Sequence, residues 1–421
     1  MQLLNNIMKT TKFSCLALLF LTVLGARGEP FRTNVNPALL YYQAFILRGE
    51  LPQADNDFLF TNQWQGRKLP ARFGGLVGQS DNAFKLVHQA AHATAPCDWG
   101  IDWSAGPYTL LPQLSRIKAT AQMARLRAMW DLQNSRPADA RDDLLAAFTM
   151  GRNCSRDNSL IAVLVEIAAE NIVVSTVAEN FGRFSNETLK QLVDGFDAAP
   201  ARGTVANAFA TIEAHIFPDW AQATVLELRS QYPDNDAKVL DSFRSLFEEN
   251  GDAGQKDTTT WPKIVKAAGG TSEGFLKLIR ELKPMELRQA AIAALPLSEF
   301  DMEERQFYAE LKKSTNPLFN ALFPALRPAR SKEFAILTEL AMLRAAVEYR
   351  LQGEAGVQSV MDPCGNGPFE FQRFVFNGED RGFELKSTYS GRGYPEAMIF
   401  VEKDGPPFYV IGRNAGKAVS P

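Results

Sequence analysis

The chain of 421 residues carries 45 basic and 48 acidic side chains, a formal net charge of −3, and 46% of its residues are hydrophobic. This hydrophobic content is typical of a globular protein with well-filled cores, and the length favours two or three domains. The slightly acidic balance argues against nucleic acid as a partner, because proteins that bind nucleic acids need a basic face.

The N-terminal residues 1–28 have the pattern of a secretory signal peptide. Lys9 and Lys12 form a positive region, residues 13–24 (FSCLALLFLTVL) are apolar, and small residues follow up to Gly28. The apolar run is shorter than the roughly 20 residues of a membrane span, and we find no later segment long and apolar enough for one. We therefore expect cleavage after Gly28 and a secreted or periplasmic protein without a stable transmembrane anchor. An uncleaved anchor is the alternative.

Three cysteines remain after such cleavage, namely Cys97, Cys154 and Cys364. An oxidising compartment permits one disulfide and leaves one thiol over. Cys97 and Cys154 belong to the same predicted helical region, so we expect these two to form the disulfide.

Apolar residues recur at helical spacing over most of the chain. Asn36 is a predicted N-cap, and Pro37 then opens a helix over 37–48. We expect further helices over 81–93, 110–133, 138–153, 158–181, 185–197, 205–230 and 234–249. Their short connections predict antiparallel neighbours, and hence a stack of helical hairpins.

The polar segment 250–260 (NGDAGQKDTTT) lacks periodicity and is predicted to be a loop or hinge. Helices resume over 271–352 and end at Gly353. These features predict an N-terminal helical-hairpin domain over 29–250 and a second helical region over 261–353.

The pattern changes to β-type alternation within 354–421. The alternation over 369–376 contains a phase slip that predicts a β-bulge, and Asn377-Gly378 predicts a tight turn. Further strands are expected over 383–386, 397–402 and 408–411. The predicted fold class is therefore mainly α, with stacked antiparallel helical hairpins and a small C-terminal antiparallel β-module.

Short motifs in the last third carry a resemblance. They are 343–351 (LRAAVEYRL), 362–366 (DPCGN) and 382–385 (GFEL). This region resembles the C-terminal module of a family of uncharacterised secreted helical proteins of planctomycete- and verrucomicrobia-like bacteria, and residues 97–127 resemble the same family. The region is also similar to the Asp-Pro-x-Gly turn and following hairpin of type II secretion major pseudopilins. The resemblance implies a helical architecture and export, and it implies no reaction.

Pseudopilins place an acid-rich calcium loop after that hairpin. This chain has 390–394 (SGRGY) in the corresponding place. The resemblance therefore does not extend to calcium, and we expect no cofactor.

One loop, between Cys97 and Tyr108, combines acidic and aromatic side chains. A polysaccharide-active hydrolase or lyase needs one carboxyl group as acid, a second as base or nucleophile, and aromatic faces that stack on sugar rings. The candidate catalytic residues are Asp98 and Asp102, and the candidate substrate-binding residues are Trp99, Trp103 and Tyr108. The alternative is a structural plug, in which the tryptophans bury apolar area and the aspartates cap turns.

His88 and His92 share one face of a predicted helix, and Cys97 follows closely. Such a set can bind zinc, but Gln89 occupies the position of the glutamate that a metalloprotease helix needs. We expect two ordinary helix histidines and no metal, with a zinc site as the alternative.

Stacks of helical hairpins leave concave surfaces that suit the binding of peptides or proteins. The sequence therefore favours an exported scaffold or protein- or peptide-binding protein of the cell envelope. The alternative function is a polysaccharide-active enzyme that uses the loop from Cys97 to Tyr108.

Overall fold

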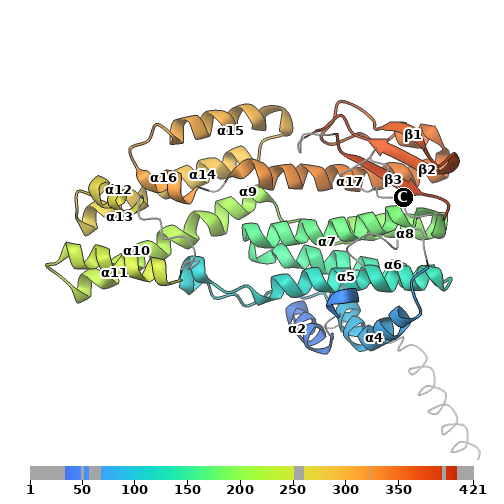
Figure 1. The fold of residues 1–421 in the computed structure, drawn as a ribbon, viewed down its shortest axis with the longest axis horizontal. Coiled ribbons are helices and arrows are strands. Elements are labelled where there is room, and N and C mark those ends of the chain that lie inside the picture. Colours follow the sequence, from blue (N-terminus) through green and yellow to red (C-terminus); the bar gives the residue numbers. More distant parts are fainter. Residues whose placement is uncertain are drawn as a thin grey trace, which may run out of the picture.

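The computed structural model describes residues 34–48, 52–55, 68–250, 260–323, 325–390 and 395–404. Helices make up most of this part of the chain, and a three-stranded antiparallel sheet follows near its C-terminal end (Figure 1). The predicted fold class is confirmed. The predicted signal peptide and the predicted strand 408–411 lie outside the described residues.

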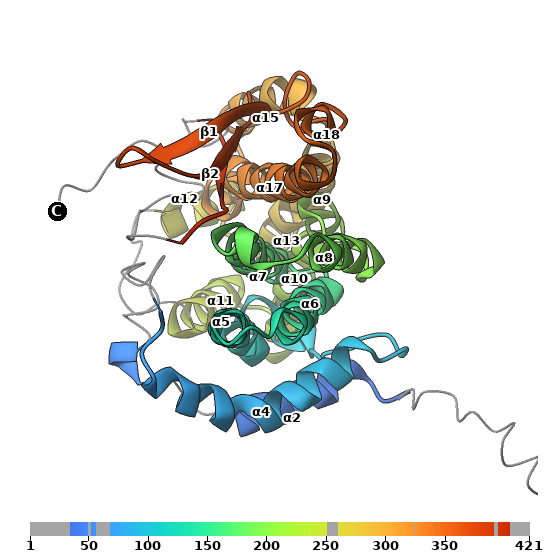
Figure 2. The same ribbon diagram turned by 90° about the vertical axis from the view of Figure 1, so that its right-hand side faces the viewer.

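Three layers of helices form one end of the molecule (Figure 2). The outer layer is α2 (Pro37–Leu47) with α4 (Arg72–Ala91). It packs on a middle layer of α5 (Pro112–Gln133) and α6 (Pro137–Cys154). The third layer is α7 (Leu160–Glu179) with α8 (Asn186–Ala198). Consecutive helices are therefore neighbours in space, as short connections require.

Polar side chains start these helices at the positions that the sequence indicates. The side chain of Asn36 accepts a hydrogen bond from the Ala38 amide, and Pro37 fills the first helical position. The hydroxyl of Ser185 accepts from the Thr188 amide in the same way. These caps satisfy amide groups that have no partner inside the helix.

Helix α4 is longer than the predicted helix over 81–93, because it already begins at Arg72. Three glycines between 74 and 78 dilute the helical signal there. One of them has a packing role, since a Cβ on Gly74 would lie 2.5 Å from the indole of Trp130.

The other end of the molecule is built from shorter helices (Figure 1). A bent helix leads into it, made of α9 (Val205–Ala208), the π-helical turn η4 (Phe209–Glu213) and α10 (Ala214–Gln231). The remaining helices there are α11 (Asp236–Asn250), α12 (Thr260–Ala267), α13 (Ser272–Arg280), α14 (Leu282–Ala293), α15 (Leu297–Leu311) and α16 (Pro317–Leu322). Helix α17 (Leu326–Gln352) then runs back along the molecule to the sheet (Figure 1).

A short helix, α18 (Glu354–Gln358), precedes the sheet of β1 (Glu370–Phe376), β2 (Glu379–Lys386) and β3 (Ala397–Val401), in that spatial order. The register between β1 and β2 shifts between Phe374 and Val375, so the predicted bulge is confirmed. Asn377 and Gly378 both have positive φ, at 53° and 80°, as the tight hairpin turn requires.

The two largest apolar clusters of the core each span several helices, and a third lies between α2, α4 and the middle layer. The first joins helices α4 to α8 with the later part of α17 and the sheet, through side chains such as Phe148, Leu343 and Phe383. The second joins α9 to α16 with the earlier part of α17, through side chains such as Phe275 and Phe334. The predicted division into 29–250, 261–353 and 354–421 therefore cuts across both clusters.

Helix α7 corrects one expectation from the sequence. Among the described residues it is long and apolar enough, by length and composition, to cross a membrane. However, 67% of its apolar window is buried inside the protein, and it contains Glu166 and Glu170 with no exposed surface. Burial of most of its surface explains its apolar composition as that of a core helix.

Candidate functional site

The indole of Trp99 packs and hydrogen-bonds against the helical stack, and so holds the loop between Cys97 and Tyr108 on it. Trp99 is only 5% exposed, and its ring stacks on Tyr41 and Phe45 of α2 with centroid distances of 5.7 and 6.4 Å. Its Nε1 donates a hydrogen bond to the backbone carbonyl of Asn153 at 2.8 Å. A ring held in this way has no open face for a sugar.

The two candidate catalytic aspartates bond to the backbone of their own loop. The carboxylate of Asp98 accepts from the Gly100 amide at 2.9 Å, and that of Asp102 accepts from the Ser104 amide at 2.9 Å. Both side chains are exposed. The bonds from Ser104 lower the pKa of Asp102, whereas a catalytic acid needs a raised one. These contacts are those of turn-capping residues.

The aromatic side chains of the loop do not converge. Tyr108 packs edge-on against Trp220 of α10, with ring centroids 5.4 Å apart, whereas Trp99 faces α2. Gly106 has a φ of 60°, and a Cβ there would lie 2.3 Å from the Trp220 side chain. The loop thus ends in the 3₁₀ turn η1 (Trp103–Tyr108), which is pressed against α10.

The structure therefore separates the residues that the polysaccharide-active alternative needs in one place. The candidate binding residues Trp99 and Tyr108 face different helices. Trp103, which lies between them in the sequence, is half-buried. The physical reason is that burial of large aromatic surface and backbone capping fix these side chains before any ligand is present.

The two cysteines expected to form a disulfide are both free thiols in this structure. Cys97 and Cys154 nevertheless belong to the same apolar cluster, beside Trp99. Burial raises the pKa of Cys97 to about 12 and raises that of Cys154 as well. As reduced thiols they are unreactive, because the thiolate is the nucleophile.

The histidines of the alternative zinc site point in different directions. Nε2 of His88 lies 2.7 Å from the carboxylate of Asp143, which also accepts from Arg127 at 2.8 Å. Nδ1 of His92 lies 2.8 Å from the carbonyl oxygen of His88. Within the ranges that the structure describes, no three His, Cys, Asp or Glu side chains are grouped to hold a metal ion.

A buried ionic network links α6, α7 and the segment after α8. Arg152 Nε lies 2.5 Å from a carboxylate oxygen of Glu170, and Arg202 pairs with the same carboxylate. The neighbouring Glu166 accepts from the Gly203 amide at 3.0 Å, and burial raises its pKa. Because Glu166 and Glu170 have no exposed surface, the network is closed to a ligand.

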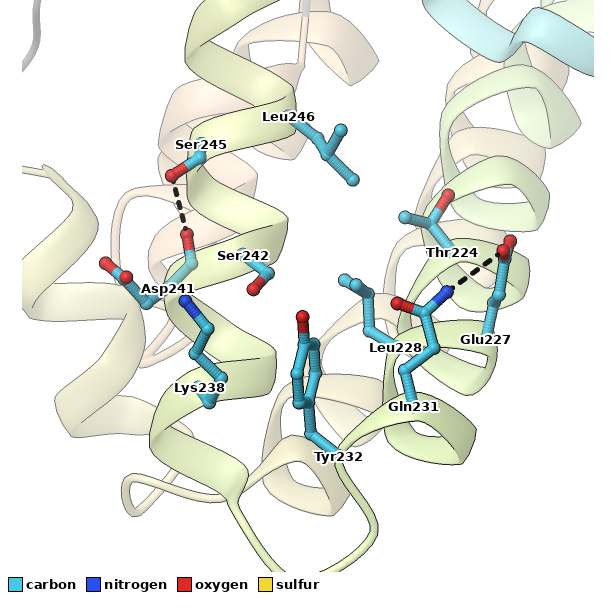
Figure 3. A pocket seen from close by; sticks show the side chains of 10 residues that line it. All are labelled: Thr224, Glu227, Leu228, Gln231, Tyr232, Lys238, Asp241, Ser242, Ser245 and Leu246. Atoms are coloured by element: carbon cyan, nitrogen blue, oxygen red, sulfur yellow. Dashed lines mark hydrogen bonds between the residues drawn. The ribbon is translucent and has the colours of Figure 1, made fainter.

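Sequence reasoning missed a groove of about 480 Å³ between α10 and α11 (Figure 3). Its lining residues come from both helices and the turn between them: Thr224, Glu227, Leu228, Gln231, Tyr232, Lys238, Asp241, Ser242, Ser245 and Leu246. The sequence pattern at these positions is that of the outer faces of two ordinary amphipathic helices, so it gives no sign of a groove.

The turn between the helices shapes the groove. The Tyr232 amide donates to the Leu228 carbonyl at 2.9 Å and closes α10, and the side chain of Asn235 accepts from the Lys238 amide at 3.0 Å and starts α11. The Tyr232 side chain therefore stands at the closed end, between the two helices (Figure 3). The Lys238 ammonium lies 5.9 Å from the centroid of its ring.

Comparison of the chain with models of protein families, with curated proteins and with solved structures finds no match.

Proposed function

We propose that this protein is an exported binding protein of the cell envelope, and that the groove between α10 and α11 holds a short segment of a partner protein or a peptide. One observation carries the proposal: an open groove of about 480 Å³ has both apolar and polar side chains along its walls. Ligand sites in proteins are commonly clefts of roughly 300–1,000 Å³ that contain a few convergent polar groups.

The groove is accessible and rests on a packed support. The hairpin of α10 and α11 lies at the end of the molecule opposite the sheet (Figure 1). Beneath the groove, Val239, Leu240 and Phe243 are buried in the second apolar cluster. A groove that exists before binding loses little conformational entropy when a ligand enters.

The apolar part of the groove supports a protein or peptide ligand. Leu246 is 37% exposed and Leu228 is buried on the facing helix. An apolar side chain of a partner would cover Leu246 and remove it from water, which is favourable. The proposed export rests on the pattern of residues 1–28.

The test is a selection of peptides from a random heptapeptide display library on the immobilised chain 29–421. The most enriched peptide is then synthesised with acetyl and amide caps, and its dissociation constant is measured by fluorescence anisotropy. We expect binding in the micromolar range or tighter, on the order of −8 kcal/mol.

Ser242→Trp fills the groove and is expected to weaken binding by at least about 10-fold. Ser115→Trp is the matched control, because Ser115 is exposed on α5 in the other half of the molecule. Both variants should keep the melting temperature of the unchanged chain. Failure to enrich any peptide, or binding that is indifferent to Ser242→Trp, would remove the proposal.

A further inference from the structure

We infer that the ligand of the groove between α10 and α11 is an uncharged, extended peptide segment whose backbone amides bond to Tyr232 and Ser242, with one apolar side chain between Leu228 and Leu246. The inference rests on the proposed function and names the class of segment that the same groove takes.

The charged groups of the lining do not face the middle of the groove. Figure 3 shows the carboxylates of Glu227 and Asp241 pointing away from it, toward the outer sides of their helices. The Lys238 ammonium is held over the ring of Tyr232. A charged ligand side chain in the middle would therefore be desolvated without an opposite charge, which is unfavourable.

Neutral polar groups face the groove instead. The hydroxyl of Ser242 is half-buried and has no hydrogen-bond partner within the described part of the chain, whereas Ser245, one turn later on the same helix, donates to the Asp241 carbonyl at 3.1 Å. A helix serine usually bonds back to its own backbone in the manner of Ser245. The hydroxyl of Tyr232 is likewise unpaired among the residues described, so both can serve a ligand.

Gln231 adds an acceptor. Its Nε2 donates to the Glu227 carboxylate at 3.3 Å, and this bond directs its amide oxygen toward the groove (Figure 3). One amide oxygen and two hydroxyls are the partners that a peptide group needs, since it brings one donor and one acceptor.

The same groups favour an extended segment over a helix. A helix satisfies its own backbone amides, so it would present only side chains to these hydroxyls. An extended segment has free backbone groups and binds through them while its side chains give specificity. Leu228 and Leu246 point into the groove from opposite helices and can hold one apolar side chain of that segment (Figure 3).

A sugar fits the groove less well. Sugar sites generally stack an aromatic face on the ring of the ligand, but one face of Tyr232 lies under the Lys238 ammonium. The Tyr232 ring also packs against the apolar cluster that contains Leu228.

The experiment uses the most enriched, capped heptapeptide of the library and the chain 29–421. We expect N-methylation of the two amides that flank its apolar anchor to weaken binding roughly 10-fold or more, because each loses a hydrogen bond. Tyr232→Phe and Ser242→Ala should each weaken it roughly five- to ten-fold. The control variant Asp194→Asn, at an exposed residue of α8 outside the groove, should change it less than about two-fold, and about 0.05 and about 0.5 M salt should give the same affinity.

The outcomes separate the two proposals. Suppose that a peptide binds in the groove, but N-methylation leaves its affinity unchanged, the peptide is charged, or salt lowers its affinity. The binding function then stands, and the extended, uncharged ligand is wrong. If a glycan array gives a ligand that Ser242→Trp blocks and no peptide binds, both the peptide ligand and the extended segment are wrong.

Discussion

The indole nitrogen of Trp99 bonds to the backbone carbonyl of Asn153, 2.8 Å away and 54 residues later in the chain. Asn36 adds two bonds to the same loop, since its side chain donates to the Asp98 carbonyl at 2.6 Å and accepts from the Asp98 amide at 3.0 Å. The loop therefore joins the start of α2 to the end of α6. It holds the outer helical layer in place, and its acidic and aromatic composition serves that role.

Replacement of Trp99 by alanine should destabilise the protein by about 3–5 kcal/mol, because a large buried aromatic side chain leaves a cavity. Trp99→Phe retains the stacking on Tyr41 and Phe45 but removes the donor to Asn153, and should cost about 1–2 kcal/mol. Urea unfolding followed by circular dichroism measures both. Asp98→Asn is the control with an expected change below about 1 kcal/mol, and an unchanged midpoint for Trp99→Ala would show that the loop does not support the stack.

The buried thiols give a second prediction. Because burial raises the pKa of Cys97 to about 12 and that of Cys154 also upward, both thiols should resist alkylation in the folded, reduced protein. We expect iodoacetamide at pH 8 to modify them at least about 100-fold more slowly than in urea-unfolded protein. Peptide mass spectrometry measures the rate at each cysteine.

The same digest tests the disulfide. Protein matured in an oxidising compartment and digested without reductant should contain the linked Cys97 and Cys154 peptides if the predicted disulfide forms there. Two separate, slowly alkylated peptides would mean that the cluster keeps both thiols reduced. Rapid alkylation of either thiol in folded protein would contradict the burial that the structure shows.

Local signals account for what the sequence predicted well. The N-cap at Asn36, the turn at Asn377-Gly378 and the bulge beside Phe374 all depend on residues close together in the chain. A phase slip in a strand exposes a bulge directly, because side chains alternate between the two faces.

Long-range contacts account for what the sequence did not predict. Trp99 and two aspartates in one loop suggest a sugar site, and only the positions of Tyr41 and Asn153 show that the ring is buried. The groove was missed for the same reason. Leu228 and Leu246 line one groove because of the angle between α10 and α11. The hydrophobic periodicity of the sequence does not determine that angle.

The buried ionic network should be sensitive to the loss of one partner. Glu170→Gln leaves Arg152 and Arg202 with Glu166 as their remaining carboxylate partner, and should cost about 3–5 kcal/mol because two largely buried cations lose the nearer of their two counter-charges. The matched control is the exposed pair of Lys190 and Asp194, 3.0 Å apart, where Asp194→Asn should cost less than about 1 kcal/mol. Equal midpoints in urea for the two variants would mean that the network contributes little to the fold.

The half-buried carboxyl group of Glu286 on α14 predicts how stability depends on pH. Burial, and then the nearby carboxylates of Glu213 and Asp219, raise the pKa of Glu286 to about 8, while Lys283 lowers it. Between about pH 4.5 and about pH 8, Glu286 is therefore protonated in the folded state but ionised in the unfolded state. The contribution of Glu286 to stability is thus present below that window and is lost as the pH rises through it.

Glu286→Gln removes this titration while keeping the shape of the side chain. The variant should match the unchanged protein at pH 5 and exceed its free energy of unfolding at pH 9, on the order of 2 kcal/mol. Urea unfolding at both pH values measures the difference. Asp194→Asn again serves as the exposed control, and it should leave the difference between the two pH values unchanged. If the stability of Glu286→Gln follows that of the unchanged protein at both pH values, Glu286 is ionised in the folded state at pH 5 and the raised pKa is wrong.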